Sequence, residues 1–243
     1  MAEVGTAERN KSYILVVDNN VDDRFQTSML LQRFGYSICT ASSAAGAIDF
    51  MHVAPPAAIV AEAMAGTNLV SRTKKDPRFS DAPVLLLAKI PDLDLELRTR
   101  RGEFAAYLSK PLDVEKFYQA VQAAIEKTPR KHIRIDTSLQ AKLENRDDGG
   151  KGLVTVLSEY GMFFLTEDPQ PLNEHITVSL SINGRTIKLD AVVLYSYSLE
   201  ASPFKAPGMG LKFVKITAED QAFIKTFILE KVQEGIVRQD PEK

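Results

Sequence analysis

The chain has 243 residues, of which 44% are hydrophobic and 26% are charged, a balance typical of soluble globular domains and sufficient for two of them. Its formal net charge is −2, and basic and acidic residues are nearly balanced in each half, which argues against binding along a nucleic-acid duplex. The single cysteine, Cys39, cannot form an internal disulfide, and no run approaches the roughly 18 apolar residues that span a bilayer. We therefore expect a cytoplasmic protein in a reducing compartment, without nucleic-acid binding or membrane insertion.

Residues 1–11 are polar and lack an apolar core, so we expect them to be disordered. From residue 12 to residue 127, apolar runs alternate with amphipathic stretches, the pattern of strands joined by crossover helices. The clearest strands are residues 13–17, 58–61, 84–88 and 105–108, whose continuous apolar character requires helices on both faces of the sheet. We predict a doubly wound, five-stranded parallel α/β sheet, whose ligand crevice lies at the carboxyl ends of the strands.

Apolar residues at helical spacing predict the helices between these strands. Three groups of them define the expected buried faces: Phe25, Met29 and Phe34; Ala44, Ile48 and Met51; and Phe117, Val121 and Ile125. Gly35 is placed to end the first helix, and Asp113 is placed to cap the last one.

The residues at the strand ends resemble those of a two-component receiver domain. That family has two acidic residues after its first strand, a phosphoryl-accepting Asp after the third, a hydroxyl residue after the fourth and Lys-Pro after the fifth. The matching residues here are Asp18, Asn19, Glu62, Ala88 and Lys110. Asn19 removes a charge that magnesium prefers, Glu62 is one methylene too long, and Ala88 offers no hydroxyl. We therefore interpret residues 12–127 as a pseudo-receiver with a degenerate phosphorylation site.

Two hypotheses concern Glu62. In the first, its longer side chain reaches the Lys110 ammonium and holds the domain permanently in one signalling conformation, with Tyr107 at the family's aromatic switch position packed inward. In the second, Glu62 and Lys110 form an inherited ion pair without regulatory meaning, because partly exposed pairs contribute only about 0 to 1 kcal/mol.

Residues 128–243 have the pattern of short strands with turn signals, which indicates a second fold class. Residues 176–182 and 187–194 flank Asn183-Gly184, a two-residue hairpin turn, and residues 211–216 form another strand. The polar, glycine-rich residues 144–152 are interpreted as a hairpin connection. We predict a small antiparallel barrel closed by a helix that begins at Thr217, with Asp220 completing its cap. The expected buried stripe of that helix is Phe223, Ile224, Phe227, Ile228 and Val232.

Two motifs in this second region resemble those of the PilZ domain. Arg130 and Arg134 match R-x-x-x-R, while Ser158 and Gly161 match the end of [D/N]-x-S-x-x-G. Val156 stands where the family has Asp or Asn.

The PilZ resemblance implies binding of the bacterial second messenger cyclic di-GMP through Arg130, Arg134, Ser158 and Gly161. A guanidinium can pair with phosphate oxygens or with guanine O6 and N7, and its flat face can stack on a purine. Val156 cannot accept the hydrogen bonds that the family's Asp or Asn takes from the guanine edge. An unpaired buried donor costs about 1 to 3 kcal/mol, which predicts weakened binding rather than its abolition.

Two further classes of function remain open. In the first, the barrel has lost the messenger and the chain is an adaptor acting by protein contacts in a signalling or motility pathway, or by self-association through the receiver-like domain. Residues 92–101 would contribute to such contacts, although their alternating charges equally suit a solvated helix face. The second class is an enzyme, and the sequence argues against it. His52, His132 and His175 are scattered along the chain and do not have the spacing of a catalytic or metal-ligand set. We expect no catalytic residue, metal or cofactor.

Overall fold

The computed structural model describes residues 13–73, 76, 79, 81–144, 150–198 and 206–236. By internal contacts the chain divides into two compact units: residues 1–131 with 233–243, and residues 132–232. The segment expected to be disordered, residues 1–11, lies outside the described residues.

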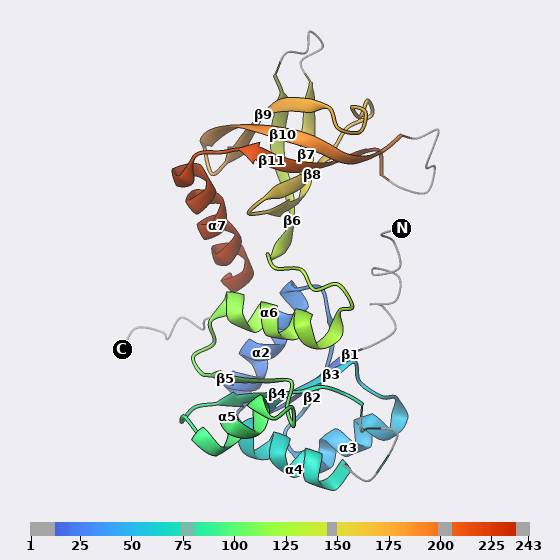
Figure 1. Cartoon of the computed structure of the whole chain (residues 1–243), viewed down its shortest axis with the longest axis vertical. Coiled ribbons are helices and arrows are strands. Elements are labelled where there is room, and N and C mark those ends of the chain that lie inside the picture. The colour runs from blue at the N-terminus through green and yellow to red at the C-terminus, as the bar shows by residue number, and fades with distance from the viewer. Residues whose placement is uncertain are drawn as a thin grey trace. The chain divides into compact units, whose positions relative to one another are not determined.

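A five-stranded parallel sheet forms the centre of the first unit. Its strands are β1 (Tyr13–Val17), β2 (Ser37–Ala41), β3 (Ala58–Glu62), β4 (Val84–Ala88) and β5 (Ala106–Ser109). Its helices are α2 (Val21–Arg33), α3 (Ala44–Val53), α4 (Ala63–Thr73), α5 (Leu93–Arg100) and α6 (Val114–Ile125). The strand order is β2-β1-β3-β4-β5, with α2 and α6 on one face and α3, α4 and α5 on the other (Figure 1). This is the predicted doubly wound α/β fold.

Side-chain caps fix where four of these helices begin. Asn20, Ser43, Asp92 and Asp113 each accept a hydrogen bond from a backbone N–H in the first turn of α2, α3, α5 and α6, respectively. Gly35 follows α2 with a φ of 89°, a left-handed conformation that glycine adopts without strain. The predicted roles of Asp113 and Gly35 are confirmed.

The buried face of α2 differs in part from the prediction, although Phe34, directly after the helix, is buried as expected. Phe25 is 42% exposed. The residues that α2 buries are Thr27, Ser28, Leu30 and Leu31. Ser28 can be buried because its hydroxyl donates to the Arg24 carbonyl oxygen at 2.7 Å. The prediction from hydropathy alone therefore placed the buried face on the wrong side of the first two turns of α2.

The expectation that residues 105–108 form a fully covered strand is also wrong. β5 begins at Ala106, and none of its residues is fully buried. It is an edge strand that pairs only with β4 within the sheet, so its neighbours cover it less completely. β1, β3 and β4 are interior strands and are almost entirely buried, as expected.

The second unit is a closed antiparallel barrel. Its strands are β6 (Arg134–Leu143), β7 (Lys151–Ser158), β8 (Gly161–Leu165), β9 (His175–Ile182), β10 (Arg185–Tyr197) and β11 (Gly208–Lys215). They close in the order β10-β11-β8-β7-β6-β9. The barrel core includes Val154, Leu157, Phe164, Val178, Leu180, Ile187, Leu189 and Met209. Closure leaves no free sheet edge, so a small domain can bury one continuous core.

Both hairpin predictions are confirmed. Asn183 and Gly184 have φ values of 49° and 81° and join Ile182 directly to Arg185, its cross-strand partner. β6 and β7 pair antiparallel across the predicted polar connection, of which residues 145–149 lie outside the described residues. β11 begins at Gly208, earlier than residue 211, the expected start.

Helix α7 (Ala218–Gln233) follows the barrel strands. The backbone N–H of Asp220 donates to the Thr217 hydroxyl oxygen at 3.0 Å, and that hydroxyl donates to the Asp220 carboxylate at 2.7 Å, as the sequence predicts. Ile224, Phe227, Ile228 and Val232 are its buried residues. No helix in the described part of the chain has both the length and the apolar character needed to cross a membrane.

Candidate functional sites

Three of the four expected ligand-binding residues meet on the wall of the barrel. Arg134 is the first residue of β6, and its cross-strand partner is Ser158, the last residue of β7. Ser158 in turn pairs with Gly161, the first residue of β8. The two strand pairings therefore place an exposed guanidinium, a hydroxyl and a close backbone approach next to one another.

The turn between β7 and β8 is fixed by contacts of its own residues. The Ser158 hydroxyl donates to the Gly161 carbonyl oxygen at 2.9 Å. A Cβ atom at Gly161 would collide with the Leu211 carbonyl oxygen of β11, so this position requires glycine for space rather than for an unusual φ. Ser158 and Gly161 thus have structural roles that do not depend on any ligand.

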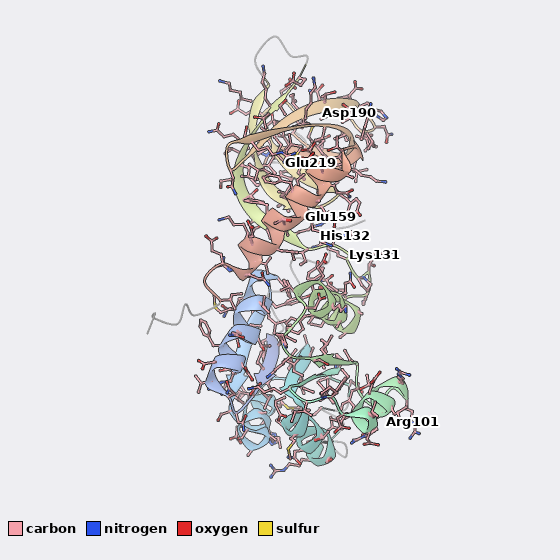
Figure 2. All side chains as sticks on the ribbon, turned by 90° about the vertical axis from the view of Figure 1, so that its left-hand side faces the viewer. Arg101, Lys131, His132, Glu159, Asp190 and Glu219 are labelled. Atoms are coloured by element: carbon pink, nitrogen blue, oxygen red, sulfur yellow. The ribbon has the colours of Figure 1, made fainter. Side chains whose placement is uncertain are left out.

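An aromatic contact links this turn to the residues preceding β6. The centre of the His132 ring lies 4.3 Å from the centre of the Tyr160 ring. Nδ1 of His132 lies 3.4 Å from a carboxylate oxygen of Glu159, and both of these residues are labelled in Figure 2. His132 and Arg134 are two residues apart, so the contact fixes the start of the strand that carries Arg134. The sequence suggested no role for His132, because its partners become neighbours only through the pairing of β6 with β7.

Arg130 belongs to the other compact unit. Its backbone N–H donates to Oε1 of Gln122 on α6 at 3.0 Å. Since the boundary between the units falls between residues 131 and 132, the R-x-x-x-R motif spans that boundary. The structure therefore brings together Arg134, Ser158 and Gly161, and it assigns Arg130 to the receiver-like unit.

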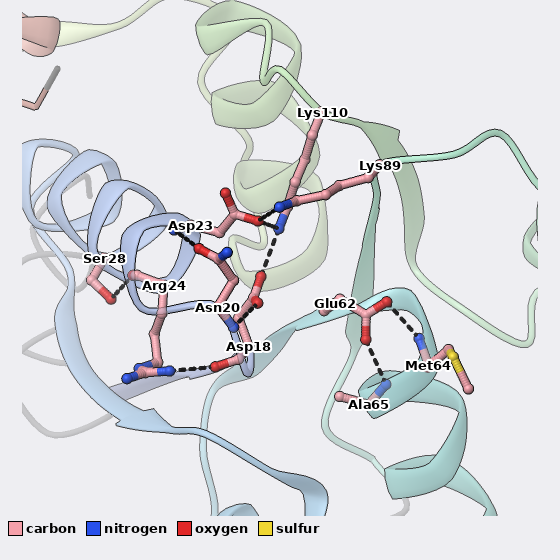
Figure 3. Close-up of polar contacts among 10 residues, drawn as sticks. All are labelled: Asp18, Asn20, Asp23, Arg24, Ser28, Glu62, Met64, Ala65, Lys89 and Lys110. Carbon is pink, nitrogen blue, oxygen red and sulfur yellow. Dashed lines mark hydrogen bonds and ion pairs between the residues drawn. The ribbon is translucent and has the colours of Figure 1, made fainter. Parts of the chain in front are cut away.

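At the carboxyl ends of the first unit's strands, ammonium and carboxylate groups form a connected network (Figure 3). Nζ of Lys110 lies 2.6 Å from Oδ2 of Asp18 and 2.9 Å from Oδ2 of Asp23. Nζ of Lys89 lies 2.8 Å from the same Asp23 oxygen. The Asp18 side chain is only 3% exposed and that of Lys110 10%, so this pair is almost fully removed from water.

Burial by itself would raise the pKa of the Asp23 carboxyl. Hydrogen bonds from Lys89 and Lys110 outweigh that effect and leave this pKa below its ordinary value. The hydrogen bond to Asp23 raises the pKa of Lys89 in turn. Asp23 is therefore ionised at neutral pH and contributes to the binding of both lysines.

The predicted contact between Glu62 and Lys110 is wrong. The two carboxylate oxygens of Glu62 accept hydrogen bonds from the backbone N–H groups of Met64 and Ala65, both at 3.1 Å (Figure 3). Glu62 thus caps the start of α4, where a carboxylate is favoured by the free N–H groups and the helix dipole. Lys110 is bound by Asp18 and Asp23 instead, so both hypotheses about a Glu62–Lys110 pair fall.

Three other residues of the receiver-like pattern lie where the sequence places them. Asn19 is exposed at the second position after β1, and Ala88 is buried at the end of β4. Tyr107 is partly buried and packs against the core of this unit, while its hydroxyl accepts a hydrogen bond from the Asp92 backbone N–H at 2.8 Å. The ring is thus packed inward, and the hydroxyl reaches the N-cap of α5.

The residues at these strand ends do not fit a magnesium ion. Asp18 accepts from the Asn20 backbone N–H through Oδ1 and binds Lys110 through Oδ2, so both of its oxygens are occupied. Asn19 supplies an amide in place of a carboxylate. Among the described residues, no group of three or more His, Cys, Asp or Glu side chains could hold a metal ion.

Asp23 and Lys89 are the residues of this candidate site that sequence reasoning missed. Asp23 lies in the first turn of α2, and Lys89 directly follows Ala88. The consecutive acidic residues Asp22 and Asp23 were a signal for Asp23, because the first turn of α2 lies beside the carboxyl ends of the strands. No pattern in the sequence pairs either of them with Lys110.

The family model of the PilZ domain matches residues 128–230 of this chain. Among curated proteins, the hybrid signal transduction histidine kinase D of Dictyostelium discoideum is 27% identical over 116 residues, which is 46% of this chain and 7% of that protein. Histidine kinase P4 of Formosa agariphila is 28% identical over 142 residues, 57% of this chain and 10% of that protein. The chain therefore spans about a tenth or less of the length of these relatives.

Among solved structures, the chain is similar to the signal receiver domain of an HD domain-containing protein from Pseudomonas fluorescens. The identity is 27% and the TM-score is 0.43, over 47% of this chain and 94% of that one.

Proposed function

We propose, from the premise that residues 128–230 form a PilZ domain, that this chain is a non-enzymatic signalling adaptor that responds to cyclic di-GMP. The combination of a receiver-like unit with a PilZ domain supports a signalling adaptor. The observation that supports the ligand is the convergence of Arg134, Ser158 and Gly161 on the barrel wall. Arg130 lies four residues before Arg134 in the chain.

The chemistry of these residues suits the messenger. Cyclic di-GMP carries two phosphates and two guanines, and a guanidinium can bind either group bidentately or stack on the base. Arg134 is exposed, so its guanidinium is accessible to such a ligand. Val156 cannot accept from the guanine edge, and a guanine donor that finds no other acceptor costs about 1 to 3 kcal/mol, or roughly one to two decades of affinity.

Messenger binding would act on the segment between the two units. A ligand that engages both Arg130 and Arg134 restricts the chain from residue 130 to residue 134, and this segment joins α6 to β6. Binding would therefore change the range of arrangements that the units can adopt, and a partner protein could detect that change. Family resemblance suggests motility or surface behaviour as the output.

The receiver-like unit would take part without being phosphorylated. Lys110 is held by two aspartates, Ala88 provides no hydroxyl, and the Glu62 carboxylate caps α4. Incubation with acetyl phosphate and magnesium should therefore leave the intact mass of the protein unchanged. A mass increase of one phosphoryl group would show that the unit is a working receiver.

Protein contacts are the proposed output, and α5 offers a surface for them. Leu93 and Leu97 are 75% and 49% exposed on this helix. The charged residues predicted to cover its solvated face pair with one another, since Arg98 binds Glu103 at 2.7 Å and Arg100 binds Glu96 at 2.6 Å. The exposed leucines are therefore flanked by charged side chains that are already paired. Such a surface suits an apolar surface of a protein partner better than a highly charged partner.

The test of messenger binding is isothermal titration of the full chain with cyclic di-GMP. We expect binding by wild type and by Val156→Asp, and loss of binding by Arg130→Ala and Arg134→Ala. Arg100→Ala is the matched control, because it removes a guanidinium that is 71% exposed on α5, outside the motif.

The alternative function is an adaptor that no longer binds the messenger, and Val156 is the observation that favours it. Absence of heat for both wild type and Val156→Asp would establish this alternative over the proposed one. Partner capture from a lysate with and without cyclic di-GMP separates the two further, because only a messenger-controlled adaptor changes its partners.

A further inference from the structure

One row of side chains crosses the outer wall of the barrel beside the expected ligand. Asp136 on β6 is the cross-strand partner of Val156 on β7, and Val156 is the partner of Phe163 on β8. Directly paired residues project from the same face of a sheet. Ile135 and Leu157, which alternate with them, are buried in the barrel core, so the row faces outward.

The same face carries the residues already assigned to the ligand. Arg134 and Ser158 form the next outward-facing pair along β6 and β7, two residues from Asp136 and Val156 respectively. A carboxylate, a guanidinium and a hydroxyl thus lie together on two neighbouring strands. The Asp136 side chain is exposed, so its oxygens are accessible from solvent.

Paired Cβ atoms on neighbouring antiparallel strands lie about 4.5–5.5 Å apart. An aspartate carboxylate on β6 can therefore serve the same small ligand as a side chain at residue 156 would. We propose that Asp136 supplies the guanine acceptor that Val156 lacks. The acceptor then lies on β6, at the cross-strand partner of residue 156, and not on β7. This inference rests on the proposed function, since it names the residue that reads the base of the messenger.

The chemistry of the row suits guanine in particular. Guanine presents two adjacent donors, N1–H and N2–H, which one carboxylate can accept together. Adenine presents an acceptor at N1, which a carboxylate would repel. Val156 and the partly buried Phe163 continue the row as an apolar surface for the face of the base.

Electrostatics makes the effect of removing Asp136 on the affinity depend on its role. The messenger carries two negative phosphates, so a nearby carboxylate without a role in binding can only weaken its affinity. Removing such a carboxylate would leave the affinity unchanged or raise it. Removing a base acceptor lowers it.

The test is calorimetric titration of four forms of the full chain with cyclic di-GMP. We expect Asp136→Ala to bind about ten- to one-hundredfold more weakly than wild type, the loss of a hydrogen bond to a charged acceptor. Glu167→Ala, which removes an exposed carboxylate from the loop after β8, is the control and should change the affinity less than about twofold. The double variant Asp136→Ala/Val156→Asp should regain most of the lost affinity, which also shows that Asp136→Ala does not act by unfolding the barrel.

A second titration uses cyclic di-AMP with the same proteins. Wild type should prefer cyclic di-GMP by at least about tenfold, because a site built to accept donors rejects a base without them. Asp136→Ala should reduce this preference.

The outcomes separate this inference from the proposed function. If wild type binds cyclic di-GMP and Asp136→Ala binds it equally well or better, the role of Asp136 is overturned and messenger binding stands. If neither wild type nor Val156→Asp gives heat, the proposed function itself fails.

Discussion

Asp18 is a buried carboxylate whose charge is balanced chiefly by one ammonium group. Lys110 lies 2.6 Å away and is itself largely buried, and Asp23 then links Lys110 to the exposed Lys89. Removing water from two charges is costly, so such a pair contributes little net stability, but removing one partner leaves the other charge unpaired. This network therefore makes the strand ends sensitive to single substitutions.

Replacing Lys110 should destabilise the receiver-like unit. We expect Lys110→Met to lower its free energy of unfolding by about 3–5 kcal/mol, because Asp18 then keeps a buried charge without its cation. Urea unfolding followed by circular dichroism measures the change. Lys89→Met is the control: it removes an exposed partner of the same network and should cost much less, and an equal loss in the two variants would contradict this account.

Acidification should act on the same network through Asp23. Its pKa is lowered in the folded protein, so the stability it contributes is complete above its unfolded value, about 3.8, and is lost as the pH falls through the lower folded value. Asp23→Asn should flatten this part of the curve of unfolding free energy against pH. A variant curve parallel to that of wild type down to the acid transition would rule out the contribution.

Helix α7 is attached to the barrel by contacts at its first turn. Arg185, at the start of β10, binds Glu219 and Asp220 at 3.0 and 2.7 Å, and its guanidinium lies 4.9 Å from the centre of the Phe223 ring. The Thr217 hydroxyl caps the same turn. Polar contacts thus fix where the helix starts, and its apolar stripe supplies the buried surface along the rest of its length.

The cap of α7 should have a measurable effect on stability. Thr217→Ala is expected to cost about 1 kcal/mol, because the N–H of Asp220 loses its acceptor. Thr226→Ala changes the same residue type at an exposed position within the helix and should be neutral or slightly stabilising. Chemical denaturation of the two variants side by side tests the prediction, and an equal effect of both would mean that the cap contributes nothing.

At the scale of the whole molecule, the chain consists of two units with separate cores. It passes from the first unit to the second through the connection between α6 and β6 and returns to the first after residue 232. The R-x-x-x-R motif spans the boundary between them, with Arg130 in the first unit and Arg134 at the start of β6. Any ligand that binds both arginines therefore acts on the connection itself. Under the proposed function, a signal would pass from the barrel to the receiver-like unit in this way.

Hydrogen–deuterium exchange of the full chain should detect that coupling. Saturating cyclic di-GMP is expected to slow amide exchange both in the β7–β8 turn, residues 156–163, and in the connection, residues 126–134. Arg130→Ala, in which we expect binding to be lost, should show neither effect. Slowing confined to the β7–β8 turn in wild type would refute the coupling while leaving ligand binding intact.

Much of the fold could be predicted from the sequence because its signals are local. Continuous apolar strands, a glycine after α2, a hydroxyl before α7 and Asn183-Gly184 between alternating residues each act over a few positions. The burial of Ser28 on α2 was not predicted, because its hydroxyl finds a backbone acceptor within its own helix. A hydropathy scale treats serine as polar and does not include this hydrogen bond, which offsets the cost of burying the hydroxyl.

The sequence by itself determined the two fold classes, the order of the elements and the positions that carry each motif, since these depend on residue type and spacing. Only the tertiary structure decided which charges meet. Lys110 could have bound Glu62, but the start of α4 offers that carboxylate two N–H groups, and Asp18 and Asp23 bind the ammonium instead. In the same way, strand register alone placed Asp136 opposite Val156, because cross-strand neighbours are fixed by pairing rather than by distance along the chain.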